Sequence, residues 1–198
     1  YRRQRQMCIR DSVKFDTWEE TFAALRDIFA KEAQRHKELQ SSEKCDGYSR
    51  KVYERLVNGS ATEVELSSAL LDLSAMLHSH YDVAPVIIID EYDTPIQQGH
   101  SEDYYDKIIR FMRNLFSGGF KDNSHLSFGF LTGILRVAKE SIFSGMNNLS
   151  INSVLDNKYS AYFGFTADEV REMAAYYDAA DKLSLIHISE PTRLALIS

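Results

Sequence analysis

The stretch APVIIIDEYDTP, residues 84–95, constrains the fold most, because an uninterrupted apolar run is followed directly by three carboxylates within four residues. The run VIIID is rich in β-branched residues and does not alternate with polar ones, which is typical of a central parallel strand covered on both faces. Helical patterns precede and follow it. Strands that alternate with helices of ten or more residues predict an α/β fold with parallel strands and right-handed crossovers.

Local signals place the other elements along the chain. A helix is expected to begin at Asp16 or Thr17, where either residue serves as an N-cap. A second strand is expected in HLSFGFLTGI, ending near Thr132. The last helix, in FTADEVREMAAYYDAA, carries a capping box formed by Thr166 and Glu169. Further helices are predicted in RKVYERLVNG, over about 62–80, and over 104–116, where SGGF ends the last of these.

Both ends of the chain resemble translated sequencing adapter. The closing LSLIHISEPTR, residues 183–193, is the in-frame translation of a transposase-based adapter, and the opening YRRQRQMCIRDS resembles the opposite strand. We therefore expect residues 1–12 and 183–198 to be adapter-derived, and the gene product to be truncated at both ends. The interior of roughly 170 residues is enough for one domain with a sizeable core.

Charge and cysteine content argue against several classes of protein. The whole chain has a net charge of −6, and the interior reaches −9 once the five arginines and two acidic residues of the adapter-like ends are removed. Such an acidic balance gives no signal for nucleic-acid binding. No apolar run reaches the roughly 18 residues of a membrane span. Cys45 is then the one natural cysteine, which excludes a disulfide framework and suits a reducing cytoplasm.

The carboxylates after the VIIID strand form a candidate site. Ligands of open α/β sheets bind at the carboxyl ends of strands, where Asp90 and Glu91 fall. An apolar strand followed by Asp-Glu is the Walker B arrangement, in which the aspartate orients Mg²⁺ and the glutamate polarises a water for attack on a γ-phosphate. The same pattern also fits a buried strand whose aspartate only caps a helix or pairs with a lysine. Both interpretations stay open on this motif alone.

Three segments, in order, resemble one family. VIIIDEYDTP, FGFLTGILRVAKESIFSGMNNL and YFGFTADEV are together similar to the bacterial AAA-ATPase-like family, whose members are often followed by a nuclease-type domain of the PD-(D/E)XK class. VKFDT fits the strand that precedes the first long helix of that family. The resemblance covers residues 13–181, and it divides the chain into a partial core, residues 13–165, and the start of a C-terminal helical region, residues 166–182.

The resemblance implies the fold class and the site. The fold would be α/β, a truncated P-loop NTPase of the AAA/ASCE type, with a parallel sheet sandwiched by helices and with the first strand and the P-loop missing. ATP and Mg²⁺ would be the cofactors. Asp90 would bind the metal and the nucleotide, Glu91 would be a catalytic residue, and Thr132 would be a catalytic polar sensor near the γ-phosphate. Arg136 would contact a phosphate.

A G-x-x-x-x-G-K-[ST] motif occurs nowhere in the chain. That loop supplies backbone N–H groups and a lysine to the phosphates, and its hydroxyl holds Mg²⁺. We therefore expect an inactive fragment of a cytoplasmic ATPase whose P-loop lies upstream of Val13. The alternative function is a non-hydrolysing nucleotide-sensing or protein-binding module that regulates an attached effector, such as a nuclease. The expected partners are ATP and a nuclease-type domain or other protein, without a membrane.

Other polar residues near the strand and helix ends have competing interpretations. Asp93 is either a further metal ligand or, as we favour, a turn residue that satisfies backbone donors ahead of Pro95. A two-metal nuclease centre built on the three carboxylates would need an E-x-K element, which the chain does not offer. His78 and His80 lie two residues apart on a predicted helix, so they do not share a face, and we expect them to be surface histidines.

Overall fold

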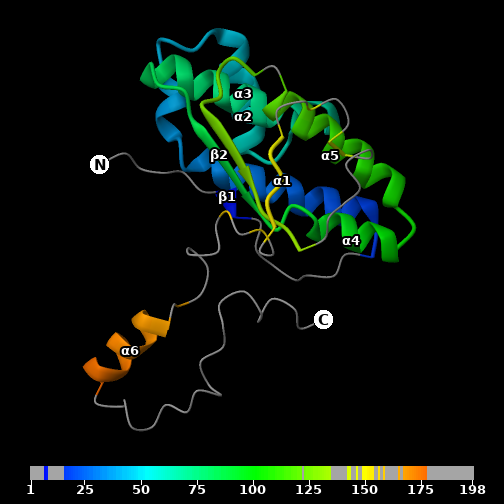
Figure 1. The fold of residues 1–198 in the computed structure, drawn as a ribbon. Coiled ribbons are helices and arrows are strands. Elements are labelled where there is room, and N and C mark those ends of the chain that lie inside the picture. The colour runs from blue at the N-terminus through cyan, green and yellow to red at the C-terminus, as the bar shows by residue number, and fades with distance from the viewer. Residues whose placement is uncertain are drawn as a thin grey trace. The chain divides into compact units, whose positions relative to one another are not determined.

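The computed structural model describes residues 7–8, 16–121, 123–134, 142–143, 146, 149–153, 156, 158, 165 and 167–177. The chain divides into two compact units, residues 1–147 and 148–198, which are described separately. The first unit contains a parallel sheet and the helices α1 to α5 (Figure 1). The second contains helix α6 (Ala167–Tyr176), which confirms the expected C-terminal helix. Its predicted cap, Thr166, lies outside the described residues.

The sheet has three parallel strands in the order β1-β2-β3, namely β1 (Met7–Cys8), β2 (Val86–Asp90) and β3 (Phe128–Leu131). In the register of β2 and β3, Ile89 lies opposite Leu131. The two strands predicted from their apolar runs are thus confirmed, as is their parallel arrangement. β1 falls within residues 1–12, whose adapter origin stays a prediction, because a short extended segment pairs with an open sheet edge whatever its source.

In the part of the chain that the structure describes, helices cover one face of the sheet. Ile87 and Ile89 are buried on that face, and a Cβ added at Gly129 would lie 2.5 Å from ring carbons of Phe120, the last residue of α5. Because side chains alternate along a strand, Phe128 and Phe130 point to the opposite face, where both are exposed. The expected second layer of helices is not found among the described residues.

The helices before β2 begin where their capping residues predict. α1 (Trp18–Gln34) starts after Thr17, whose hydroxyl accepts a hydrogen bond from the backbone of Glu20. α3 (Glu63–Tyr81) starts with a reciprocal capping box between Thr62 and Glu65. Between them lie the short 3-10 helix η1 (Lys37–Ser41) and α2 (Gly47–Val57), which Asp46 caps. Each cap satisfies backbone N–H groups that would otherwise lack a partner at the helix start.

Two helices follow β2, where the sequence predicted a loop and one helix. α4 (Thr94–Ser101) has Pro95 in its first turn, a position that suits proline because its missing N–H has no partner there. The expectation of a plain turn ahead of Pro95 was therefore incomplete.

Helix α5 (Tyr105–Phe120) begins close to the predicted start and runs through SGGF, so the predicted end at residue 116 was wrong. Close packing against α3 explains why glycine occupies this helical stretch. A Cβ added at Gly119 would lie 2.8 Å from the side chain of Leu70. The glycine is thus a packing residue and does not end the helix.

Helices α1, α3 and α5 share the core that supports the sheet. The rings of Trp18 and Phe22 from α1 meet the edge of Phe111 from α5, with centroids 6.0 and 6.1 Å apart. Edge-to-face contacts of this kind add to the free energy of burying large rings. Leu66 and Phe116 are fully buried in the same layer. Among the described residues, no helix is long and apolar enough to cross a bilayer.

Candidate functional site

The candidate site forms where β2 and β3 end side by side. Because Ile89 lies opposite Leu131, Asp90, the last residue of β2, and Thr132, the first residue after β3, come together at the same edge of the sheet. Thr132 N–H donates to the carbonyl of Ile89 at 2.9 Å, and Tyr92 N–H donates to the carbonyl of Thr132 at 3.0 Å. The backbone ladder therefore continues past both strands and fixes Thr132 beside Asp90.

The hydroxyl of Thr132 has two partners. It donates to Oδ1 of Asp90, and it accepts from the backbone N–H of Glu91, with a nitrogen-to-oxygen distance of 3.3 Å. A hydroxyl carries a single proton, so the proton of Thr132 is committed to the Asp90 carboxylate in this arrangement. The structure thus brings together three of the sequence-predicted site residues, Asp90, Glu91 and Thr132.

Glu91 adopts an uncommon backbone conformation. Its φ is +53°, in the left-handed region, which non-glycine residues rarely occupy. The chain reverses there directly after β2, and the carbonyl of Glu91 accepts from Thr94 N–H at 3.1 Å as α4 begins. The side chain of Glu91 is exposed. The carboxylate of Glu91 therefore faces solvent next to Asp90 in sequence.

Asp93 is buried, with a relative exposure of 1%, and thus differs from the two carboxylates before it. Its Oδ2 accepts from the backbone N–H of Ile134 at 3.1 Å and from Nε2 of Gln97 at 2.9 Å. The side chain makes no capping bond to α4 itself. The favoured interpretation of Asp93 as a residue that satisfies a backbone donor is correct in kind, but the donor belongs to the segment after β3.

The arrangement fits a magnesium ion that takes one carboxylate from this region. The described residues contain no group of three or more His, Cys, Asp or Glu side chains placed to hold a metal ion. Mg²⁺ commonly binds through one or two carboxylates and fills its other positions with water and phosphate oxygens. Oδ2 of Asp90 has no hydrogen-bond partner among the described residues, and the side chain is partly exposed. Asp90 therefore has an oxygen for such an ion.

The remaining predictions concern Arg136, His78 and His80. Arg136 lies outside the described residues, so its role as a phosphate contact stays a prediction. His78 and His80 are half-buried and do not share a partner. Nδ1 of His78 lies 3.1 Å from Nδ1 of His125, and Nδ1 of His80 lies 2.8 Å from the hydroxyl of Ser42. The two histidines thus take part in separate contacts, whereas the sequence predicted plain surface residues.

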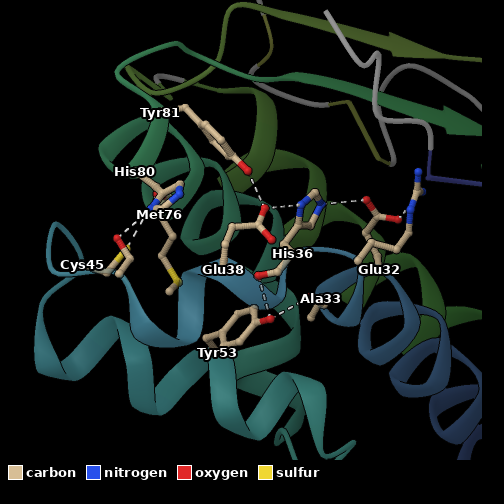
Figure 2. A network of polar contacts seen from close by, with 11 residues as sticks. Glu32, Ala33, His36, Glu38, Cys45, Tyr53, Met76, His80 and Tyr81 are labelled. Atoms are coloured by element: carbon tan, nitrogen blue, oxygen red, sulfur yellow. Dashed lines mark hydrogen bonds and ion pairs between the residues drawn. The ribbon is translucent and has the colours of Figure 1, made fainter.

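A second polar cluster lies where α1, η1 and α3 meet, and the sequence analysis missed it (Figure 2). His36 is 2% exposed, with Nε2 3.2 Å from Glu32 and Nδ1 3.8 Å from Glu38. Arg35 donates to Glu32, and Tyr81 donates to Glu38 at 2.5 Å. The imidazole therefore lies between two carboxylates. The four-residue spacing of Glu32 and His36 on one helix face was the available signal.

Tyr53 of α2 lies beneath this cluster. Its hydroxyl is 2.9 Å from the carbonyl oxygens of both Ala33 and His36, at the end of α1 (Figure 2). Burial, and secondarily the nearby charge of Glu38, raises the pKa of Tyr53 to about 12. The phenol therefore serves as a neutral donor to carbonyls that each also accept a backbone N–H, from His36 and Leu39 respectively.

Comparison with known proteins identifies the family of this chain. A family model described as "Predicted AAA-ATPase", AAA-ATPase_like, matches residues 6–143. The chain belongs to this AAA-ATPase-like family. The match includes β2, β3 and the strand-end residues, and it begins within the segment that resembles adapter.

A curated relative shares part of the sequence. An uncharacterised protein encoded in the 5′ region of vnfD in Azotobacter chroococcum is 32% identical over 120 residues, which are 60% of this chain and 23% of that protein. The chain thus spans less than a quarter of the relative that it matches. No solved structure matches the chain. AAA-ATPase-like membership associates the chain with nucleotide binding in general.

Proposed function

We propose that the intact AAA-ATPase-like protein binds ATP with Mg²⁺ and hydrolyses it at the carboxyl ends of β2 and β3. One observation carries the proposal. In a chain of this family, the hydroxyl of Thr132 donates to the carboxylate of Asp90 at the ends of adjacent parallel strands, with the exposed Glu91 next in sequence. Strand ends of open parallel sheets are where such folds bind ligands.

In this proposal each side chain has one task. Mg²⁺, when bound with ATP, supplies positive charge to the phosphate oxygens. Asp90 orients the metal, directly or through its waters, with the oxygen that Thr132 leaves unbound. Thr132 holds the Asp90 carboxylate in one orientation. Glu91 accepts a proton from, or polarises, the attacking water.

ATP binding also needs phosphate ligands that this chain does not supply. The 198 residues contain no G-x-x-x-x-G-K-[ST] motif, and backbone N–H groups of such a loop hold the phosphates in P-loop enzymes. We propose that another part of a longer protein supplies this loop. The location in the cytoplasm expected from the sequence stays a prediction.

The test begins with sequencing across both ends of the original locus, followed by expression of the intact protein. With Glu91→Gln, we expect ATP hydrolysis to fall at least about 100-fold while ATP affinity stays within a few-fold, because a group that polarises the nucleophile acts mainly on the chemical step. With Asp90→Asn, we expect the Mg²⁺ concentration for half-maximal hydrolysis to rise about tenfold. Glu102→Gln, at an exposed carboxylate after α4, is the matched control and should change neither quantity.

A different outcome would support the second candidate. Tight ATP binding by the intact protein without hydrolysis, unchanged by Glu91→Gln, would indicate a nucleotide-sensing or protein-binding module that regulates an attached effector, such as a nuclease-type domain. Glu91 would then be an exposed residue of a turn. If the intact protein neither binds nor hydrolyses ATP, the ATPase and the nucleotide-sensing module are both excluded, and the protein-binding module is left.

A further inference from the structure

Asp93 connects the loop after β2 to the segment after β3. Its carboxylate is buried, and Oδ2 accepts the backbone N–H of Ile134, which lies two residues beyond Thr132. The same oxygen accepts from Gln97 on its own helix α4. Of these two bonds only the one to Ile134 reaches the β3 side of the site. Asp93 is therefore placed to fix the course of residues 132–134.

Gly133 shows how closely this segment runs past Asp93. A Cβ added at Gly133 would lie 2.7 Å from Oδ1 of Asp93 and 2.8 Å from Cε1 of Tyr92. Distances below 3.0 Å require something to shift, and the Asp93 carboxylate is 1% exposed and already holds the N–H of Ile134, while the ring of Tyr92 packs against Phe116 and Phe143. At position 133, only glycine avoids displacing Asp93 or Tyr92.

We propose that Asp93 is a positioning residue of the strand-end site. By holding Ile134, it keeps the Thr132 hydroxyl against the Asp90 carboxylate, and so keeps Asp90 in the orientation that the metal requires. The inference rests on the proposed function for its effect on hydrolysis. The hydrogen bond between Asp93 and Ile134 is independent of any activity. Asp93 itself touches no nucleotide in this account, and its role differs from that of a third metal ligand.

The kinetic test uses the intact protein with Asp93→Ala. Misplacement of a reacting group by about 1 Å costs roughly 100-fold in rate, so we expect kcat to fall about 10- to 100-fold, while KM for ATP changes less than about threefold. Gln97→Ala is the matched control, because it removes the other bond to the same oxygen and leaves Ile134 in place. It should leave kcat within about twofold.

Gly133→Ala gives a second variant if Asp93→Ala does not fold. It retains the Asp93 carboxylate and pushes the segment away from it, so the same split between kcat and KM is expected. Gly118→Ala in α5 is its control, because a Cβ there would meet its nearest neighbour at 3.8 Å, an ordinary contact.

Hydrogen exchange measured on the same variants separates positioning from a general loss of stability. In Asp93→Ala we expect the amide of Ile134 to exchange at least about tenfold faster, while amides of α3 and α5 keep their protection. Faster exchange throughout the first unit would overturn the inference, as would a kcat within twofold of the parent protein. A parent protein that hydrolyses no ATP would overturn the proposed function alone, and the exchange of Ile134 would still decide whether Asp93 holds the segment.

Discussion

The hydroxyl of Thr132 donates its proton to Oδ1 of Asp90, and this bond joins the ends of β2 and β3 across a sequence separation of 42 residues. The same hydroxyl accepts the backbone N–H of Glu91. One side chain therefore sets both the orientation of the Asp90 carboxylate and the start of the reversal that exposes Glu91. The two strand ends are therefore joined through the side chain of Thr132.

Replacing Thr132 tests what the hydroxyl contributes. Thr132→Val keeps the shape and removes both hydrogen bonds, so we expect the free energy of unfolding to fall by about 1 kcal/mol and ATP hydrolysis by the intact protein to fall about 10- to 100-fold. Thr132→Ser retains the hydroxyl and should stay within a few-fold in rate. Urea unfolding and steady-state hydrolysis measure the two effects. A Val variant as active as the Ser variant would contradict the role of the hydroxyl.

Glu91 should show a conflict between stability and function. Glycine removes the steric cost of the left-handed conformation, roughly 1 kcal/mol for other residues, whereas alanine removes the same carboxylate and keeps that cost. We expect Glu91→Gly to be more stable to urea than Glu91→Ala, with both equally poor in hydrolysis. Equal stability of the two variants would mean that the positive φ of Glu91 carries no strain.

Tyr53 should matter for the helical layer below the His36 cluster. Tyr53→Phe removes the phenol donor from the carbonyls of Ala33 and His36, which each keep a backbone N–H partner, so we expect the free energy of unfolding at pH 7 to fall by about 1 kcal/mol. The pKa of Tyr53 is raised to about 12 from 10. Its contribution is therefore complete below pH 10 and is lost as pH rises through 12. Tyr48→Phe, at an exposed tyrosine of α2, is the control and should have little effect.

Two aspartates should show opposite pH dependence. Burial raises the pKa of Asp72, an effect that its hydrogen bond from Ser68 partly offsets, so Asp72 lowers stability as pH rises above 3.8 and through its folded-state pKa. The hydrogen bond and charge of Lys44 lower the pKa of Asp82, so its contribution is present above pH 3.8 and lost as pH falls through the folded-state value.

Unfolding free energies measured from pH 3 to 7 test this pair. Relative to the parent chain, Asp72→Asn should become more stable as pH rises, and Asp82→Asn should become less stable. The Asp82 effect should be the smaller, because both of its partners are exposed and solvent screens the pair. The same sign for both variants would contradict the assigned causes.

The sequence alone predicted the strand ends because their signals are local. A β-branched run before Asp90 and Glu91 identifies both the strand and its carboxyl end, and capping residues such as Thr62 locate helix starts. Pro95 was less informative, because proline fits the first turn of a helix as well as a tight turn. Glycines were misread as a helix end where Gly119 instead allows α5 to approach α3.

Contacts between distant residues could not be predicted in the same way. The bond from Ile134 to Asp93 spans 41 residues and depends on the register of two strands. Likewise, the packing of α1 against η1 and α3 decides that His36 is buried between carboxylates. A single sequence specifies neither the register of two strands nor the packing of distant helices, so these contacts are seen only in the folded chain.

The most direct test of the central claim is a double-mutant cycle between Asp90 and Thr132 in the intact protein, read out as Mg²⁺-dependent ATP hydrolysis. If Thr132 acts by orienting Asp90, then Thr132→Val should add little to a protein that already carries Asp90→Asn, and the coupling energy should exceed about 1 kcal/mol. If the two substitutions instead lower the rate by independent, multiplicative factors, the hydrogen bond between these residues does not organise a nucleotide site.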